Sequence, residues 1–84
     1  MTDQIHTIII RVPKKDSSYV YFTLEANEGL CFYSTLKHQK ESPFRDIEIK
    51  LTNSLTNEFL TVFKFLSDNI EVTVLEDNDN ITNR

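Results

Sequence analysis

Polar and apolar residues alternate along residues 44–51 and 70–75, and this period of two is typical of strands with one buried face. Residues 5–12 are rich in β-branched residues and end at Pro13, which also predicts a strand. A fourth segment, residues 30–37, contains two adjacent aromatic residues, and the polar turn HQKESP joins it to residues 44–51 as a predicted hairpin. The positions expected to face inward are Ile8, Ile10, Val12, Ile47, Ile49, Leu51, Ile70, Val72 and Val74.

Residues 54–68 form the clearest predicted helix, because their apolar residues recur at the spacing of one helical face. Asn53 or Ser54 is suited to cap its start, and Asn69 is suited to a left-handed exit. The apolar face consists of Leu55, Phe59, Val62, Phe63 and Leu66.

Residues 17–28 fit two structures. Alternation puts Val20, Phe22, Leu24 and Ala26 on one side, as in a strand, but the same residues also lie within one wide helical arc. The Asp-Ser start and the exit at Gly29, the only glycine of the chain, favour a helix. The alternative makes residues 19–26 a strand and gives a meander with one helix.

With a helix at 17–28, the element order is β-α-β-β-α-β, which is the ferredoxin-like plan. The predicted fold class is therefore α+β, with a four-stranded antiparallel sheet and two helices on one face. We expect a single domain over residues 1–76. Residues 77–84 are polar and acidic, and we expect them to form a disordered tail.

The segment D-S-S-Y-V-Y-F-T-L-E-A-N-E-G-L-C-F-Y-S-T-L, with R-D-I-E-I after it, resembles a family of small bacterial proteins of unknown function. Members of that family pair L-E-x-x-E-G-L with an S-T strand, and the resemblance covers about residues 5–76. It implies a helix before Gly29 and an ACT-like or ferredoxin-like domain. It implies no activity.

The net charge of −4 argues against general binding to nucleic acids or anionic membranes, since both favour a basic surface. One cysteine cannot form an internal disulfide and is typical of the reducing cytoplasm, where we expect this protein. No apolar run reaches the roughly 18 residues of a membrane span. A chain of 84 residues has a small core, so dimerisation is the stabilising device to look for.

The loop between the first strand and the first helix is the candidate ligand site. In ACT-type domains that loop usually contains a glycine and meets an amino acid, whereas here it reads VPKKDSS. Lys14, Lys15, Asp16 and Ser17 are the candidate residues, either for an amino acid or for a small anion at the helix N-terminus. Helix capping by Asp16 and a solvated loop explain the same residues more simply.

No arrangement of residues in the sequence points to an enzyme, a cofactor or a metal. The spacing of Cys31, His6 and His38 indicates neither a catalytic pair nor a metal site. A lone cysteine in a strand usually behaves as a small apolar residue. Glu25 and Glu28 lie three residues apart, but on the predicted wet face of their helix.

The predicted function is a non-enzymatic interaction module that forms a homodimer through its sheet. One face of the sheet has no helix to cover it, and Ile9, Leu75 and an aromatic residue of the second strand, assigned to Tyr33, are the expected contacts. Pairing of edge strands is a second route to the dimer. The alternative function is an ACT-like regulatory domain that binds an amino acid or a small anion at loop 13–18 or at the dimer interface.

Overall fold

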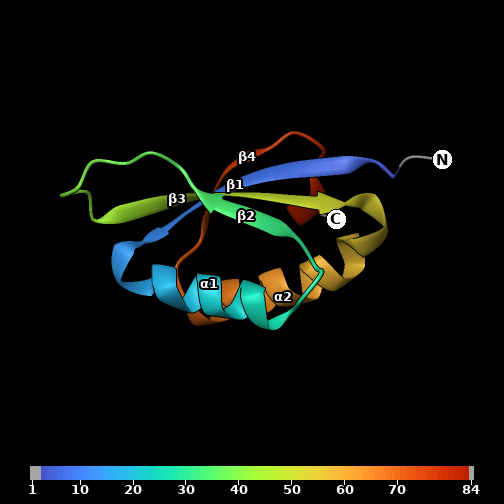
Figure 1. The fold of residues 1–84 in the computed structure, drawn as a ribbon, viewed down its shortest axis with the longest axis horizontal. Helices are drawn as coiled ribbons and strands as arrows, with labels where there is room; N and C mark the ends of the chain where they lie inside the picture. Colours follow the sequence, from blue (N-terminus) through green and yellow to red (C-terminus); the bar gives the residue numbers. More distant parts are fainter. Residues whose placement is uncertain (1–2, 84) are drawn as a thin grey trace.

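The computed structural model describes residues 3–83 and contains the predicted four strands and two helices (Figure 1). The sheet has the order β2-β3-β1-β4, and all neighbouring strands are antiparallel. The fold class is therefore confirmed as α+β with a ferredoxin-like arrangement. The elements are β1 (Ile5–Pro13), α1 (Ser17–Ala26), β2 (Phe32–Thr35), β3 (Phe44–Thr52), α2 (Thr56–Asn69) and β4 (Thr73–Asp77), with short 3-10 helices η1 (Lys14–Asp16), η2 (Asn53–Leu55) and η3 (Ile81–Asn83).

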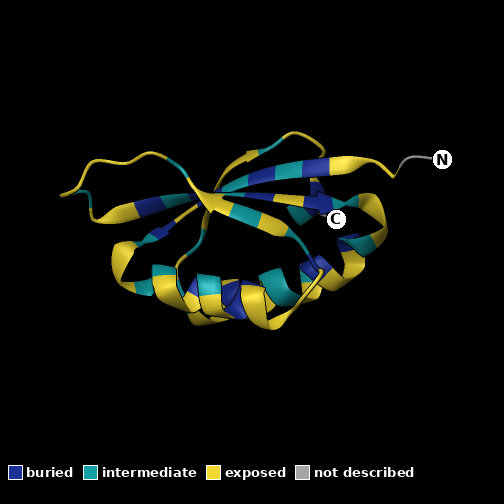
Figure 2. Ribbon diagram, viewed as in Figure 1, coloured by how far each residue is buried: buried dark blue, intermediate teal, exposed yellow. Residues whose placement is uncertain are grey.

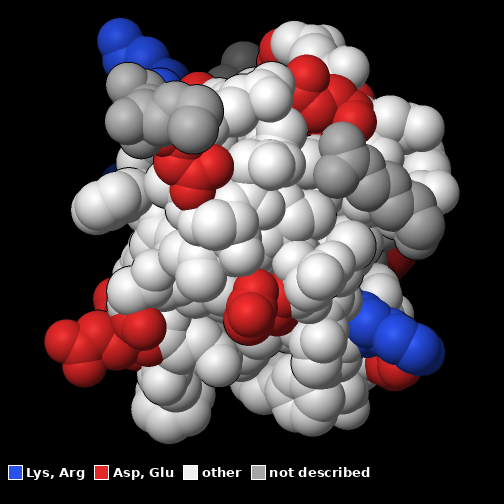
Figure 3. Space-filling model, turned by 90° about the vertical axis from the view of Figure 1, so that its right-hand side faces the viewer, with Lys and Arg blue, Asp and Glu red and all other residues white. Residues whose placement is uncertain are grey.

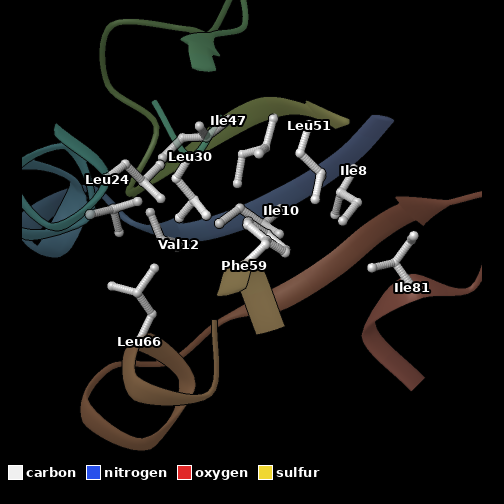
Figure 4. Packing of buried hydrophobic residues seen from close by; sticks show 12 residues of the cluster. Ile8, Ile10, Val12, Leu24, Leu30, Ile47, Leu51, Phe59, Leu66 and Ile81 are labelled. Atoms are coloured by element: carbon white, nitrogen blue, oxygen red, sulfur yellow. The ribbon is translucent and has the colours of Figure 1, made fainter. Parts of the chain in front are cut away.

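The two helices lie side by side on one face of the sheet, and the core fills the space between the layers (Figure 1). β1 and β3 supply half of its buried apolar residues, because every second residue of each strand points toward the helices. Figure 2 shows this alternation as bands along the strands. The predicted inward set of these two strands is confirmed. The buried apolar residues are Ile8, Ile10, Val12, Val20, Leu24, Leu30, Ile47, Ile49, Leu51, Phe59, Leu66 and Ile81 (Figure 4).

The ambiguous segment before the glycine is a helix, α1. Val20, Thr23 and Leu24 face the core, and the Thr23 hydroxyl donates a hydrogen bond to the Tyr19 carbonyl at 2.8 Å, so its polar group is satisfied. Phe22, expected within the apolar arc, is 72% exposed on the solvent side of the helix. The inward arc is thus narrower than the sequence suggested, because only three or four positions of a ten-residue helix can meet the sheet.

Gly29 has a positive φ of 80°, as expected, but it does not occupy the position directly after the last helical residue. The helix ends at Ala26, and a turn then closes through a 3.0 Å hydrogen bond from the Leu30 amide to the Asn27 carbonyl. Gly29 is the third residue of that turn, where a left-handed conformation is required. A Cβ atom there would meet nothing within 4 Å, so the backbone conformation rather than space demands glycine.

Helix α2 begins at Thr56, two residues later than predicted, because η2 precedes it. Neither Asn53 nor Ser54 caps it with a side-chain hydrogen bond. Asn69 also differs from the prediction: it stays helical, and its side-chain amide donates to the Phe65 carbonyl at 2.7 Å. The C-cap residue of α2 is Ile70, whose backbone is extended, so the helix ends without a left-handed residue.

The last strand lies later than predicted, at Thr73–Asp77 rather than 70–75. Ile70 and Val72 are partly buried in the connection from α2, whereas Val74 is 38% exposed. The reason is that β4 is an edge strand with an irregular register, so fewer neighbours cover its inward side.

The C-terminal residues differ most from the prediction, which ended the domain at residue 76. Residues 77–83 finish β4 and form η3, and Ile81 is fully buried in the core. Asp77 begins η3 by accepting hydrogen bonds from the amides of Ile81 and Thr82, both at 2.9 Å, and from the Thr82 hydroxyl at 2.7 Å. A buried apolar residue and the hydrogen bonds of Asp77 thus hold this polar segment in place. Arg84 lies outside the described residues, as do residues 1–2.

Candidate functional site

Phe32 is the most exposed large apolar residue of the described chain, with 84% of its surface open to solvent. It pairs with Lys50 across the β2–β3 ladder, while its neighbour Tyr33 pairs with the buried Ile49. Residues opposite each other point to the same side of a sheet. Phe32 therefore projects from the face that the helices leave uncovered.

Three further apolar residues lie on this uncovered side or its edge. Ile5 is 61% exposed. Ile9 lies four residues further along β1, on the same side of the strand, and is half-buried. Leu75, 44% exposed, falls in the β4 irregularity, between Val74, which pairs with Ile10, and Glu76, which pairs with Ile9. We refer to Ile5, Ile9, Phe32 and Leu75 as the outer apolar set.

Four charged residues of the uncovered face lie in two pairs of opposite charge. The Arg11 guanidinium donates two hydrogen bonds to the Asp46 carboxylate, at 2.8 and 3.0 Å, and lies 5.8 Å from the centre of the Phe44 ring. This bidentate contact holds the pKa of Asp46 below its usual value and raises that of Arg11. Lys50 lies 4.0 Å from Glu48. These four charges need no partner from another molecule.

Tyr33, the predicted interface residue of β2, lies on the other side of the sheet. Its ring stacks on that of Tyr21 in α1, with 5.3 Å between the ring centres. The Tyr33 hydroxyl donates a hydrogen bond to the Glu25 carboxylate, and the Tyr21 hydroxyl forms one with the Thr35 hydroxyl. The hydrogen bond to the Glu25 carboxylate raises the pKa of Tyr33 to about 12. Tyr33 thus ties α1 to the edge strand, and Phe32 takes the place on the uncovered face that the sequence analysis gave to Tyr33.

The predicted strand 30–37 contains Phe32 and Tyr33 side by side, and only one of two adjacent strand residues can face outward. Because both are aromatic, the sequence leaves that choice open, and the assignment to Tyr33 was wrong. The pairing of β2 with β3 decides which aromatic residue faces outward. Ile47 and Ile49 point into the core, and their partners Thr35 and Tyr33 therefore point to the same side.

An apolar hollow of about 130 Å³ adjoins Phe32 at the end of the sheet where β2 begins. Figure 3 looks onto this end of the molecule, where uncharged atoms dominate and carboxylates stand among and around them. Cys31 lines the hollow and is half-buried, and burial raises its pKa to about 11. Its thiol is therefore neutral at physiological pH and unsuited to act as a nucleophile. The hollow is lined by Ile5, Gly29, Leu30, Cys31, Phe32, Lys50, Leu51, Thr52 and Leu55.

The predicted ligand loop lies at the opposite end of β1. Lys14, Lys15 and Asp16 form η1, and Ser17 starts α1. Asp16 makes no capping hydrogen bond with its side chain, which corrects the capping role expected for it; Ser17 instead donates to the Lys14 carbonyl at 2.8 Å. The two lysines border a wide, open hollow beside Pro43, Phe44 and Glu71. The loop and the outer apolar set do not form one site.

Residues 3–83 bring no three His, Cys, Asp or Glu side chains together in a way that could hold a metal ion. Within the same residues, no helix combines the length and the apolar character needed to cross a membrane. No protein-family model, curated protein or solved structure matches this chain. The candidate site therefore rests on the geometry of the molecule itself.

Proposed function

We propose that this protein is a small, non-enzymatic interaction module that forms a homodimer through the outer apolar set. The observation that carries the proposal is Phe32, which is 84% exposed on the uncovered face of the sheet. A chain of this size gains little stability from its own core, and covering this face with a second copy adds to it.

The charges of the face suit a symmetric contact. In a two-fold dimer each patch meets its own copy, so unpaired charges would face like charges. Here Arg11 is bound to Asp46, and Lys50 lies beside Glu48, so that each pair is close to neutral as a unit. The apolar members then supply the attraction, with Phe32 as the aromatic anchor that interfaces favour.

Sedimentation velocity over a range of concentrations tests the proposal. We expect the wild-type chain to shift from monomer to dimer as concentration rises, and the Phe32→Ser variant to remain monomeric. Phe22→Ser is the matched control, because Phe22 is 72% exposed but lies on the helical layer. Loss of the dimer in Phe22→Ser alone would place the interface on the helices and refute the proposal.

A second candidate is an ACT-like regulatory domain that binds an amino acid or a small anion at loop 13–18. It is favoured by the adjacent lysines Lys14 and Lys15, which are exposed at the start of the first helix. A thermal-shift screen of amino acids, phosphate and sulfate tests it, because a ligand of the native state raises the melting temperature by mass action. Equal shifts in the wild type and in a Lys14→Ala, Lys15→Ala variant would remove this candidate.

A further inference from the structure

His6 is a buried, doubly hydrogen-bonded histidine that joins three distant segments of the chain. It lies on the inward side of β1 and is only 2% exposed. Its Nδ1 atom lies 2.6 Å from Oδ2 of Asp79, in the segment before η3, and its Nε2 atom lies 2.8 Å from Oδ1 of Asn53, at the start of η2. The imidazole therefore connects the first strand with the C-terminal segment.

The partners of His6 define its protonation state. Both ring nitrogens face oxygen atoms, and an oxygen acceptor on each nitrogen is satisfied only when both nitrogens carry a proton. A neutral ring fits the site only if the Asn53 amide turns to offer its NH₂ group. The carboxylate at Nδ1 favours the imidazolium, and a hydrogen bond between ions is stronger than one between neutral groups.

The other charged groups around His6 are also carboxylates. Asp3 is held by hydrogen bonds from Ser54, at 2.5 Å from its hydroxyl and 3.3 Å from its amide, and these, with the charge of His6, lower the pKa of Asp3. Asp77, on the strand beside β1, starts η3. Two carboxylates therefore act on the imidazolium, that of Asp79 by direct contact and that of Asp3 through its charge.

We propose that protonated His6 is a latch that holds the C-terminal segment, residues 78–83, against the domain, and that the segment loosens when His6 loses its proton. The latch acts on a segment with one apolar anchor. Ile81 is fully buried and belongs to the same core cluster as Ile8 and Phe59 (Figure 4). Release of the segment would uncover this part of the core, so the latch couples pH to the exposure of apolar surface.

The sign of the effect follows from the two partners. The bond needs a negatively charged Asp79, because only the carboxylate forms an ion pair with the imidazolium. It also needs a protonated His6, so it weakens as pH rises through the titration midpoint of His6 in the folded protein. Burial of the imidazole lowers that midpoint and the direct contact with the Asp79 carboxylate raises it. Because the contact is short, we expect the midpoint above the ordinary value of about 6.5.

Two measurements on the full chain test the latch. Long-range ¹H–¹⁵N spectra between pH 5 and 9 report the protonation of each ring nitrogen of His6, with the exposed His38 as a reference signal in the same spectra. Hydrogen exchange at the amides of Ile81 and Thr82, corrected for the intrinsic effect of pH, reports the opening of the segment. We expect both nitrogens of His6 to be protonated at pH 6, and exchange to rise about tenfold for each pH unit by which folding displaces the midpoint.

The Asp79→Asn variant removes the charge and keeps the shape of the partner. We expect it to lower the midpoint of His6 and to reduce the pH dependence of exchange at Ile81 and Thr82. Asp68→Asn is the control, because Asp68 is an exposed carboxylate that pairs with Lys64 on the far side of α2. A wild-type His6 with one unprotonated nitrogen at pH 6, or exchange that does not change through its titration, would overturn the latch, whether or not the Asp79→Asn variant folds.

Discussion

Replacing Phe32 with serine is the sharpest test of the proposed interface, because its effects on folding and on association separate. Phe32 is 84% exposed, so the monomer loses little packing when the ring is removed. Substitutions at such exposed positions usually change the free energy of unfolding by less than about 0.5 kcal/mol. Urea unfolding of the wild type and the variant under monomeric conditions should therefore give nearly the same midpoint.

The effect on association is large in comparison. A phenylalanine side chain has about 200 Å² of surface, so the exposed fraction of Phe32 amounts to about 170 Å². If the dimer buries half of this area, each copy contributes about 2 kcal/mol at roughly 25 cal/mol per Å². Two copies then contribute about 4 kcal/mol, which corresponds to a dissociation constant about a thousandfold higher in the variant.

The assay is sedimentation velocity of the wild type, Phe32→Ser and Phe22→Ser at the same series of concentrations. We expect the wild type and Phe22→Ser to share one dissociation constant and Phe32→Ser to show only monomer. A wild-type chain that stays monomeric at every concentration would refute the proposed dimer. Equal dissociation constants in the wild type and Phe32→Ser would show that the chain dimerises through a different surface, and would refute the role of the outer apolar set.

Three further predictions concern the fold itself. Ile81→Ala should lower the free energy of unfolding by about 2–5 kcal/mol, since the side chain is fully buried, whereas a disordered tail would leave urea unfolding unchanged. Gly29→Ala should cost about 1 kcal/mol in the same assay, because an L-residue is disfavoured at a φ of 80°, and Gly29→Asn should cost less; an equal stability of all three chains would contradict the assigned turn. Cys31 should react with a thiol reagent at pH 8 about a hundredfold more slowly in the folded chain than in urea, because a pKa raised from 9.0 to about 11 reduces its thiolate hundredfold; equal rates would show that burial does not protect it.

The sequence by itself determined the elements whose apolar residues follow a single clear period. Ile8, Ile10 and Ile47 lie at alternate positions of long strands, and a shift by one residue would expose all of them, so the core faces of β1 and β3 follow from the pattern alone. Helix α2 follows in the same way from the spacing of Phe59 and Leu66. The ferredoxin-like order depends in addition on a helix at residues 17–28, which the local pattern left open.

Tertiary structure decided the features that a local pattern leaves ambiguous. The apolar residues of segment 17–26 fit the period of a strand as well as that of a helix. In the structure the segment is a helix that packs Val20 and Leu24 onto the sheet. The choice between Phe32 and Tyr33 on the uncovered face depends on the pairing of β2 with β3, a contact between separate segments.

The C-terminal segment shows the same limit most clearly. Its composition is polar, and only contacts with distant residues place Ile81 in the core and Asp79 beside His6, 73 positions earlier in the chain. A sequence pattern identifies the residues that share one face of a single helix or strand. The partner that covers a face, or the ion that neutralises a buried group, comes from elsewhere in the chain, and only the folded structure brings it there.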